Sequence, residues 1–428
     1  MELTVTPVLF GTFVVLLLFG APITVSLGVA AMLSFLVVGQ NLGTMVEIAF
    51  TSVNSFPIMA LPAFVLAGAL MEAAGVSKRL VFIAEKLVGP VPGGLAVSTA
   101  LACVFFGAIS GSGPATTAAV GMLMIPAMIK RDYDSGYAAA ATATAGGVGI
   151  IIPPSIPMVI YGVASQESIT RMFLAGVIPG LLIALGLIIM HLFKCRKMDV
   201  PTDMKWSGKE LLWSFKDGFW AVLAPVIILG GIYSGYFTPT EAAIVAVFYT
   251  LVIGFFVYKE LTLQALMSSL KTTSWLTGRV LIIMFTAYAF GRLLVQYRIP
   301  DQIVKVLLAF TSNPMLIWAF VVLILLFLGM FMETLAIILL VTPVLLPVMK
   351  AFGVDPIHFG IVLVCCCGVG FSTPPLGENM FIASGIADVT LEEISLKALP
   401  FCAITIGVIA LLVVFPQLAL FLPNLLMD

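Results

Sequence analysis

The chain has 428 residues, of which 61% are hydrophobic and only 10% are charged, and its formal net charge is -1. Soluble globular domains carry about 25% charged residues, so this composition excludes an ordinary soluble protein and indicates a membrane protein with many crossings. A nearly neutral chain also gives no electrostatic reason to expect a nucleic-acid partner.

The first part of the chain predicts three membrane crossings, near 4–20, 22–38 and 56–75. A helix needs about 20 apolar residues to span a bilayer, and no charged side chain occurs between residues 3 and 46. Because no basic region precedes the first apolar run, we expect it to be a retained helix rather than a signal peptide. A charged connection at 78–86 follows.

The uncharged stretch 94–129 has a polar Ser-Gly-Ser-Gly-Pro segment at 110–114, near its middle. Its length allows either two short crossings or one re-entrant hairpin. Basic residues flank both ends, and the hairpin would place both ends in the cytoplasm, as the positive-inside rule requires. The hairpin is therefore the favoured interpretation.

A crossing predicted at 137–163 is interrupted by glycines at 146–149 and by Pro153-Pro154. The next crossing, near 173–193, leads into the polar linker 194–217, which carries the densest group of lysines and arginines in the chain. The positive-inside rule places this linker in the cytoplasm.

The second half repeats this order. Its predicted elements are crossings near 219–236, 240–258 and 275–295, a hairpin at 315–349, a broken crossing at 357–385 and a last helix at 400–422. Units 1–193 and 218–428 would then each contain five crossings and one hairpin. Since five is odd, the second unit would enter the membrane upside down, and both termini would lie on the outer side.

A shift of 221 residues superimposes the breaks of the two halves. Gly147, Gly149, Pro153 and Pro154 fall on Gly368, Gly370, Pro374 and Pro375. Proline and glycine interrupt helices, and irregular backbone at membrane depth is tolerated only where protein buries it or a cavity adjoins it. A duplicated helix break therefore indicates the binding site of a transporter.

The first candidate site joins the hairpin tip to the first break. Its polar members are Ser110, Ser112, Thr116, Thr117 and Ser155. Free backbone carbonyls suit a small cation such as sodium, helix N-termini suit a carboxylate, and hydroxyl groups serve either ligand. The alternative is that these small residues only allow helices to pack closely.

The second candidate site has Glu333 and Thr334 at its hairpin tip, with Ser372, Thr373 and Asn379 at its break. A carboxylate within apolar sequence is a functional candidate, and its alternative role is a hydrogen-bonded packing group. Glu333 falls on Ser112 under the shift, so the two tips differ. We expect Arg279 and Arg292 to extend to the membrane interface rather than to bind substrate.

No ATP-binding Gly-Lys-Ser/Thr loop, metal-ligand cluster or nucleophile–base pair is evident in the sequence. Any uphill transport must therefore draw on an ion gradient or on another chain. The sequence predicts a secondary transporter and not an enzyme, although an embedded enzyme using Glu333 or Glu378 is a conceivable alternative.

Five segments together resemble the large membrane subunit of tripartite ATP-independent periplasmic (TRAP) transporters. They are 106–116 (FGAISGSGPAT), 153–162 (PPSIPMVIYG), 238–243 (TPTEAA), 329–333 (GMFME) and 373–377 (TPPLG). The resemblance implies an all-α, elevator-type sodium symporter with two inverted repeats, located in the bacterial inner membrane. It also implies an organic-acid substrate of the C4-dicarboxylate or sialic acid class.

The resemblance places sodium at each hairpin tip and helix break. The implied sodium residues are Ser110, Ser112, Gly113, Gly147, Gly149, Pro153, Glu333, Thr334, Gly368, Gly370 and Thr373. Substrate would lie between the two sodium sites, near Thr116, Thr117, Ser155, Ser372 and Asn379. Some members of the family carry an aspartate where this chain has Glu333.

The resemblance also implies two partner proteins besides the lipid bilayer. They are a small four-helix membrane subunit and a periplasmic substrate-binding protein that delivers the organic acid. A stand-alone ion-coupled anion transporter or exchanger of the same inverted-repeat architecture is the alternative.

Overall fold

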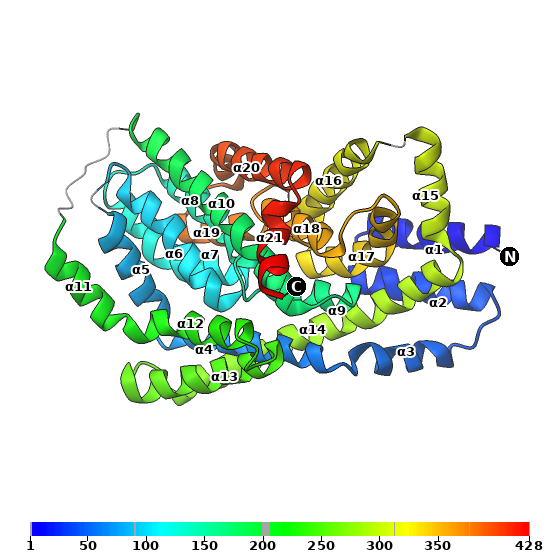
Figure 1. Cartoon of the computed structure of the whole chain (residues 1–428), viewed down its shortest axis with the longest axis horizontal. Helices are drawn as coiled ribbons and strands as arrows, with labels where there is room; N and C mark the ends of the chain where they lie inside the picture. The colour runs from blue at the N-terminus through cyan, green and yellow to red at the C-terminus, as the bar shows by residue number, and fades with distance from the viewer. Residues whose placement is uncertain (1, 90, 199–205, 312, 376, 428) are drawn as a thin grey trace.

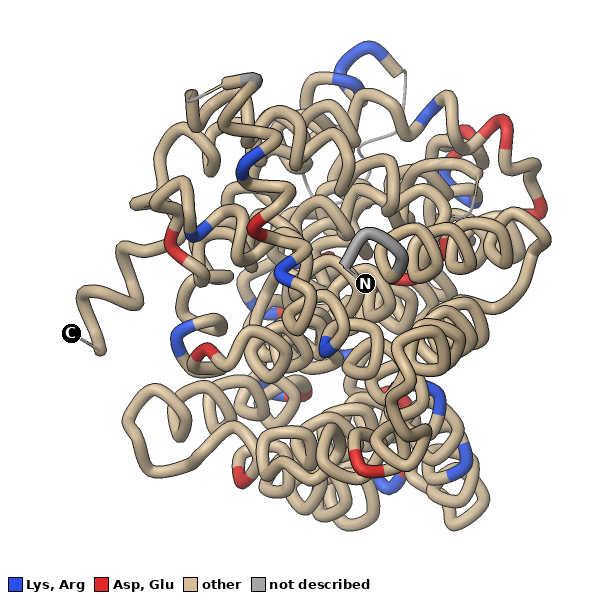
Figure 2. Tube along the Cα trace, turned by 90° about the vertical axis from the view of Figure 1, so that its right-hand side faces the viewer, with Lys and Arg blue, Asp and Glu red and all other residues tan. Residues whose placement is uncertain are grey.

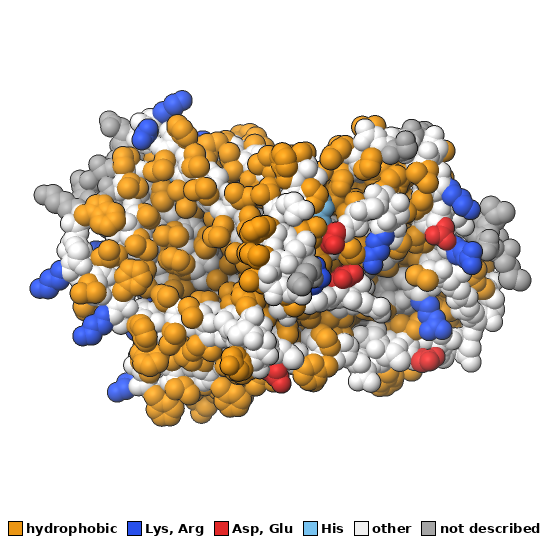
Figure 3. Space-filling model, viewed as in Figure 1, with side chains coloured by type: hydrophobic (Ala, Val, Ile, Leu, Met, Phe, Trp, Pro, Cys, Tyr) orange, Lys and Arg blue, Asp and Glu red, His pale blue; other side chains and the backbone are white. Residues whose placement is uncertain are grey.

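The computed structural model describes residues 2–89, 91–198, 206–311, 313–375 and 377–427, and every regular element in these ranges is a helix. Seven of the described helices are long and apolar enough to cross a membrane, or up to eight if the bent pair α11 and α12 forms one span. Hydrophobic side chains cover much of the surface (Figure 3), and most of the trace carries no charged residue (Figure 2). The polytopic all-α fold class expected from the composition is confirmed.

The N-terminal helices contain the predicted crossings and two further helices. They are α1 (Glu2–Leu18), α2 (Ile23–Val37), α3 (Gly43–Val53), η1 (Phe56–Met59), α4 (Ala60–Ala73) and α5 (Val76–Val88). Helix α3 has no counterpart among the predicted elements. The segment predicted as a charged connection is the amphipathic helix α5, whose buried residues face the protein while its lysines lie at the surface.

The first hairpin has two arms, α6 (Gly94–Ser110) and α7 (Gly113–Ile129). Each arm has 17 residues, about 26 Å of helix, which is shorter than the hydrocarbon core of a bilayer. The broken crossing consists of α8 (Ser135–Gly146), η2 (Gly147–Ile150) and α9 (Ile156–Ser165), and α10 (Ile169–Cys195) follows. Every residue of α8 from Gly136 to Gly146 is buried, because its small side chains let other helices surround it.

The second half begins inside the segment predicted as a linker, since α11 (Gly208–Asp217) is helical. Residues 199–205 of that predicted linker lie outside the described residues. The next elements are α12 (Phe219–Tyr233), α13 (Pro239–Val252), the π-turn η3 (Ile253–Val257), α14 (Leu263–Gln296) and α15 (Ile299–Phe310). Helix α14 extends well beyond the predicted crossing at 275–295, and α15 was not predicted.

The second hairpin and second broken crossing follow in the predicted order. The elements are α16 (Pro314–Phe331), α17 (Thr334–Ala351), α18 (Pro356–Gly370), α19 (Glu378–Ala387), α20 (Leu391–Val414) and α21 (Gln417–Met427). The predicted last helix is two helices, because α20 ends at Val414 and α21 begins three residues later.

The helices form two groups in space (Figure 1). In one group α14 packs against α2, α3 and α4, and α13 packs against α4. In the other group α7 packs against α8 and α19, and α16 packs against α18. Contacts of α14 with α17, and of α4 with α6 and α9, join the two groups. Both hairpins and both breaks belong to the second group.

Candidate transport site between the two hairpin tips

The first hairpin tip is a two-residue break whose hydroxyl groups are internally hydrogen-bonded. Ser112 is the N-cap of α7, and its Oγ accepts from the Ala115 amide at 3.4 Å. Thr116 Oγ1 donates to the Ser112 carbonyl oxygen at 2.7 Å and lies 3.0 Å from Ser110 Oγ. Gly111 between them has φ of 59°, the left-handed region that favours glycine.

This tip contacts the first helix break directly. The Ile156 amide donates to the Gly111 carbonyl oxygen at 3.2 Å. A Cβ on Gly111 would lie 2.5 Å from the Pro154 carbonyl oxygen, so a larger residue has no room there. Ser155 caps α9, and its Oγ also donates to the Ile150 carbonyl oxygen at 2.5 Å. The Pro153–Pro154 bond is cis.

Each hairpin packs a glycine of its first arm against a glycine of the adjacent broken helix. A Cβ on Gly107 in α6 would lie 2.7 Å from Gly149 Cα, and a Cβ on Gly329 in α16 would lie 3.2 Å from Gly370 Cα. The duplicated glycines therefore permit backbone to approach backbone at both hairpins.

Side chains of the second break reach into the first. Ser372 Oγ and Asn379 Nδ2 both donate to the Ala143 carbonyl oxygen, at 3.1 and 3.0 Å. Asn379 Oδ1 and Thr117 Oγ1 are buried and have no hydrogen-bond partner within the described part of the chain. Both side chains approach the position that a Cβ on Gly146 would occupy. The Thr117 hydroxyl and the Asn379 amide group thus converge beside one glycine, with Thr117 Oγ1 and Asn379 Nδ2 as their nearest atoms.

The second tip carries an ion pair that the sequence did not indicate. Glu333 holds the N-cap position of α17, and its Oε2 lies 2.6 Å from Nη2 of Arg279 on α14. The Arg279 guanidinium also lies 5.5 Å from the Trp275 ring. Arg279 lies in the middle of α14, and a carboxylate at the hairpin tip pairs with its charge, while its extension to the membrane interface stays a prediction.

One cavity of about 260 Å³ touches both tips. From the first tip it is lined by Ser110, Ser112 and Gly113, and from the second by Glu333 and Thr334. Glu72, Arg279 and Glu378 complete its charged lining, so one cation and three carboxylates face the same space. The tertiary structure thus joins residues that are separated by more than 200 positions in the chain.

The remaining predicted site residues surround this cavity without lining it. Thr116, Thr117, Ser155, Ser372 and Asn379 are buried in helix contacts. The other predicted residues form the two broken segments, namely Gly147, Gly149, Pro153, Gly368, Gly370 and Thr373. A larger cavity of about 710 Å³, lined by Arg292 and Tyr288, includes no residue of either tip.

The chain has several helices long enough to cross a membrane, and the tips of its two hairpins meet two broken helices at one cavity. These features define a polytopic membrane transporter. Solved structures agree at the level of the fold. The YdaH transporter of Alcanivorax borkumensis matches with a TM-score of 0.64 at 13% identity, covering 88% of each chain. MtrF of Neisseria gonorrhoeae matches with a TM-score of 0.61 at 15% identity, covering 87% of this chain and 84% of its own.

The family itself follows from sequence comparison. The model of the "Tripartite ATP-independent periplasmic transporter, DctM component" matches residues 10–418. The chain belongs to this family, and it is therefore a transporter permease subunit rather than an enzyme. The recognition made from the five sequence segments is confirmed.

Named relatives carry several different substrates. The isethionate TRAP transporter permease protein DctMQ of Oleidesulfovibrio alaskensis is 42% identical over 97% of this chain. The sialic acid TRAP transporter large permease protein SiaM of Vibrio cholerae is 38% identical over 96% of each chain. A C4-dicarboxylate large permease, DctM of Pseudomonas aeruginosa, is 38% identical over 88% of each. The chain spans 66% of the length of the isethionate permease.

Proposed function

We propose that this chain is the large permease subunit of a TRAP transporter that imports a small organic acid together with sodium. The observation that carries the proposal is the single cavity that joins both hairpin tips and contains Arg279, Glu333 and Glu378. Helix breaks around such a cavity offer backbone groups to an ion and a substrate at the same time.

Arg279 gives the cavity a cationic group that an anionic substrate can bind. The Arg279 guanidinium can bind a carboxylate or sulfonate through two parallel hydrogen bonds. In the structure, the Glu333 carboxylate forms an ion pair with this guanidinium. An incoming acid would displace Glu333 from Arg279, and the hydroxyl of Ser112 would bind its other polar groups. The named substrates of the relatives, isethionate, sialic acid and C4-dicarboxylates, are all acids.

Oxygen atoms near the breaks favour sodium as the coupling ion. Sodium prefers hard oxygen ligands, and helix breaks such as those at Gly147–Gly149 and after Gly368–Gly370 are where backbone carbonyl groups can serve as such ligands. The unpartnered Thr117 Oγ1 lies next to Gly146, at the start of the first of these breaks. When the acid binds Arg279, Glu333 loses its cationic partner. A sodium ion bound near Glu333 would then neutralise the Glu333 carboxylate in place of Arg279.

We further propose how the two halves of the chain are arranged, how they move and which proteins they assemble with. Units 1–193 and 218–428 would be inverted repeats, joined by a cytoplasmic linker, with both termini on the periplasmic side of the inner membrane. The hairpins and broken helices would move as a unit against the group that contains α4, α13 and α14, in an elevator motion. A small membrane subunit would accompany the chain, and a periplasmic binding protein would deliver the acid.

The test is uptake in proteoliposomes that contain the chain together with its cognate small membrane subunit. Labelled isethionate, a C4-dicarboxylate and sialic acid are offered separately, with or without the cognate binding protein, under an inward sodium gradient. We expect uptake of one acid class that needs both the binding protein and sodium. A matched potassium gradient serves as the control.

Two results would contradict the proposal. Uptake by the chain alone, without the binding protein, would favour the stand-alone anion transporter or exchanger. Uptake that is equal in the sodium and potassium gradients would remove sodium as the coupling ion and leave the family assignment unchanged.

A further inference from the structure

Helix α11 (Gly208–Asp217) has one face on the protein and one face that nothing in the chain covers. Ser214 is fully buried, whereas Leu212 and Trp213 are 73% and 59% exposed. The axis of α11 turns by 57° from that of α12 at Gly218. Because of this bend, α11 does not continue the direction of the apolar helix that follows it.

The acidic side chains of α11 are paired with basic residues of α5. Glu210 Oε2 lies 2.6 Å from Lys86 Nζ of α5. Asp217 Oδ2 lies 3.5 Å from Arg79 Nε, also on α5. Both carboxylates of the helix are therefore neutralised by basic residues of the neighbouring helix.

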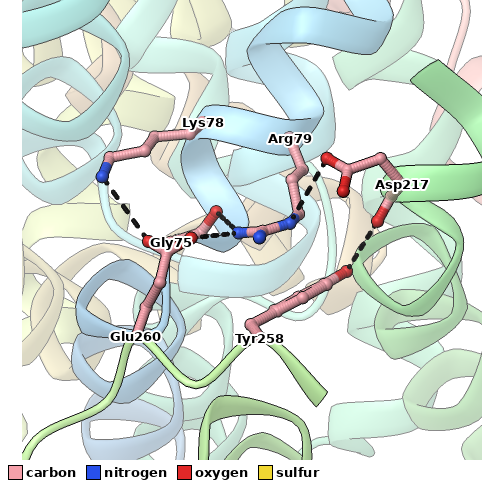
Figure 4. Close-up of polar contacts among 6 residues, drawn as sticks. All are labelled: Gly75, Lys78, Arg79, Asp217, Tyr258 and Glu260. Atoms are coloured by element: carbon pink, nitrogen blue, oxygen red, sulfur yellow. Dashed lines mark hydrogen bonds and ion pairs between the residues drawn. The ribbon is translucent and has the colours of Figure 1, made fainter. Parts of the chain in front are cut away.

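A cluster around Arg79 fixes the end of α11 in this orientation (Figure 4). The Arg79 Nη1 atom donates to Glu260 Oε1 at 2.9 Å, and its guanidinium lies 3.6 Å from the centre of the Tyr258 ring. The Tyr258 hydroxyl donates to the Asp217 carbonyl oxygen at 3.4 Å. Since this cluster connects α5, the end of α11 and the segment before α14, α11 cannot rotate freely about its axis.

The outer face combines lysine with tryptophan. At 100° per residue, Lys209, Trp213 and Lys216 lie within a sector of about 60° around the axis of α11, and Trp220 follows on α12, just after the bend. All four are exposed, and neither lysine has an ion-pair partner among residues 206–311 or the other described ranges. Figure 3 shows basic side chains projecting beside hydrophobic ones at the left edge of the molecule, where α11 lies. Arg196 and Lys197 after α10 add exposed positive charge to the same linker region.

We propose that the outer face of α11 binds the head groups of anionic phospholipids at the membrane surface. Tryptophan and lysine are the side chains that anchor helices at this depth, where an indole ring lies among the head groups and an ammonium group reaches the phosphates. A helix whose carboxylates are paired with a neighbouring helix and whose exposed lysines are unpaired selects negative lipids over zwitterionic ones. Basic residues next to a membrane helix act in this way.

The proposal does not depend on the substrate or on sodium coupling. Its test uses the full chain in bilayers of phosphatidylcholine mixed with phosphatidylglycerol, in a W275F background so that the exposed tryptophans are those of α11 and its flanks. Quenching by brominated phosphatidylglycerol, compared with brominated phosphatidylcholine, gives the relative binding constant of the anionic lipid. We expect a preference on the order of fivefold for phosphatidylglycerol, lost in the double variant K209Q/K216Q.

The matched control is K130Q/K305Q, which removes two exposed, unpaired lysines elsewhere in the described residues. Its net charge equals that of K209Q/K216Q. It should retain the preference for phosphatidylglycerol. An equal preference in K209Q/K216Q and in the unmodified chain would overturn the proposal. So would a K209Q/K216Q variant that keeps its lipid preference but loses a copurifying protein subunit, because the face would then be a protein interface. Unchanged thermal unfolding of K209Q/K216Q verifies that it folds.

Discussion

Gly147 and Gly368, which the 221-residue shift superimposes, approach each other at the centre of the molecule. A Cβ on Gly147 would lie 2.7 Å from the Gly368 carbonyl oxygen, and a Cβ on Gly368 would lie 3.2 Å from the Gly147 carbonyl oxygen. Each glycine thus lies against the carbonyl oxygen of the other. Reciprocal contacts of this kind are what a two-fold relation between the halves requires. That the second half is inverted in the membrane stays a prediction.

Adding a methyl group at this contact should destabilise the protein. In Gly147→Ala the new Cβ must displace backbone rather than a flexible side chain, so we expect a loss of about 1–3 kcal/mol in unfolding free energy. Thermal unfolding of the purified protein in detergent measures the change. Gly407→Ala in α20 is the matched control, because nothing lies within 4 Å of a Cβ there. A normal melting temperature for Gly147→Ala would show that the broken helices can separate without penalty.

The Arg279–Glu333 pair should be essential for transport. In Glu333→Gln the guanidinium loses its charged partner at the hairpin tip, and we expect uptake to fall at least tenfold, which corresponds to about 1.4 kcal/mol. Glu333→Asp keeps the charge and should retain more activity. The assay is initial uptake rate in proteoliposomes. Full sodium-dependent uptake by Glu333→Gln would exclude the carboxylate from the mechanism.

The partner residue offers an independent check. Arg279→Gln should lose uptake as well, and the double variant should lose less than the sum of the two single effects, because both remove one pair. Lys271→Gln is the matched control, since Lys271 lies two turns earlier on α14, is exposed and has no ion-pair partner in the described ranges. Strict additivity of the Arg279 and Glu333 effects would mean that the pair does not act as a unit.

Arg79 should contribute more to stability than its neighbour Lys78, although both contact Glu260. The Arg79 side chain is 14% exposed and contacts Asp217 and Tyr258 as well, whereas the Lys78 side chain is 66% exposed. We expect Arg79→Gln to lower the unfolding free energy by about 1–3 kcal/mol and Lys78→Gln by less than about 1 kcal/mol. Equal melting temperatures for the two variants would contradict this ranking.

Asp134, at the start of α8, should make stability depend on pH. Burial raises the pKa of Asp134, but hydrogen bonds from Lys397 Nζ at 2.5 Å and the Tyr137 amide at 2.7 Å outweigh burial and lower this pKa below its usual value. A lowered pKa in the folded state means stability that is present above about pH 4 and is lost as the pH falls through the folded-state pKa. Between pH 6 and pH 3 the melting temperature of Asp134→Asn should drop less than that of the unmodified protein. Identical melting profiles of the two proteins would show that Asp134 does not contribute to the pH dependence.

The sequence by itself determined the class of protein and the position of its breaks. The long uncharged runs predicted the membrane crossings, and the Gly and Pro residues placed both hairpin tips and both helix breaks within a few residues, because these residues act on the backbone locally. The family followed from the same segments. Helices α3, α5 and α15 escaped prediction, since short or amphipathic helices lack a long apolar run.

Only the tertiary structure decided which of the marked residues share a cavity. Ser112 and Glu333 were paired by a numerical shift, but their common neighbour Arg279 lies on α14, outside the repeated motifs. An arginine extends to the interface or binds a carboxylate according to what packs beside it, and the carboxylate partner of Arg279 is 54 positions away in the chain. Local residue type fixes where the backbone breaks, whereas long-range packing fixes which charges meet.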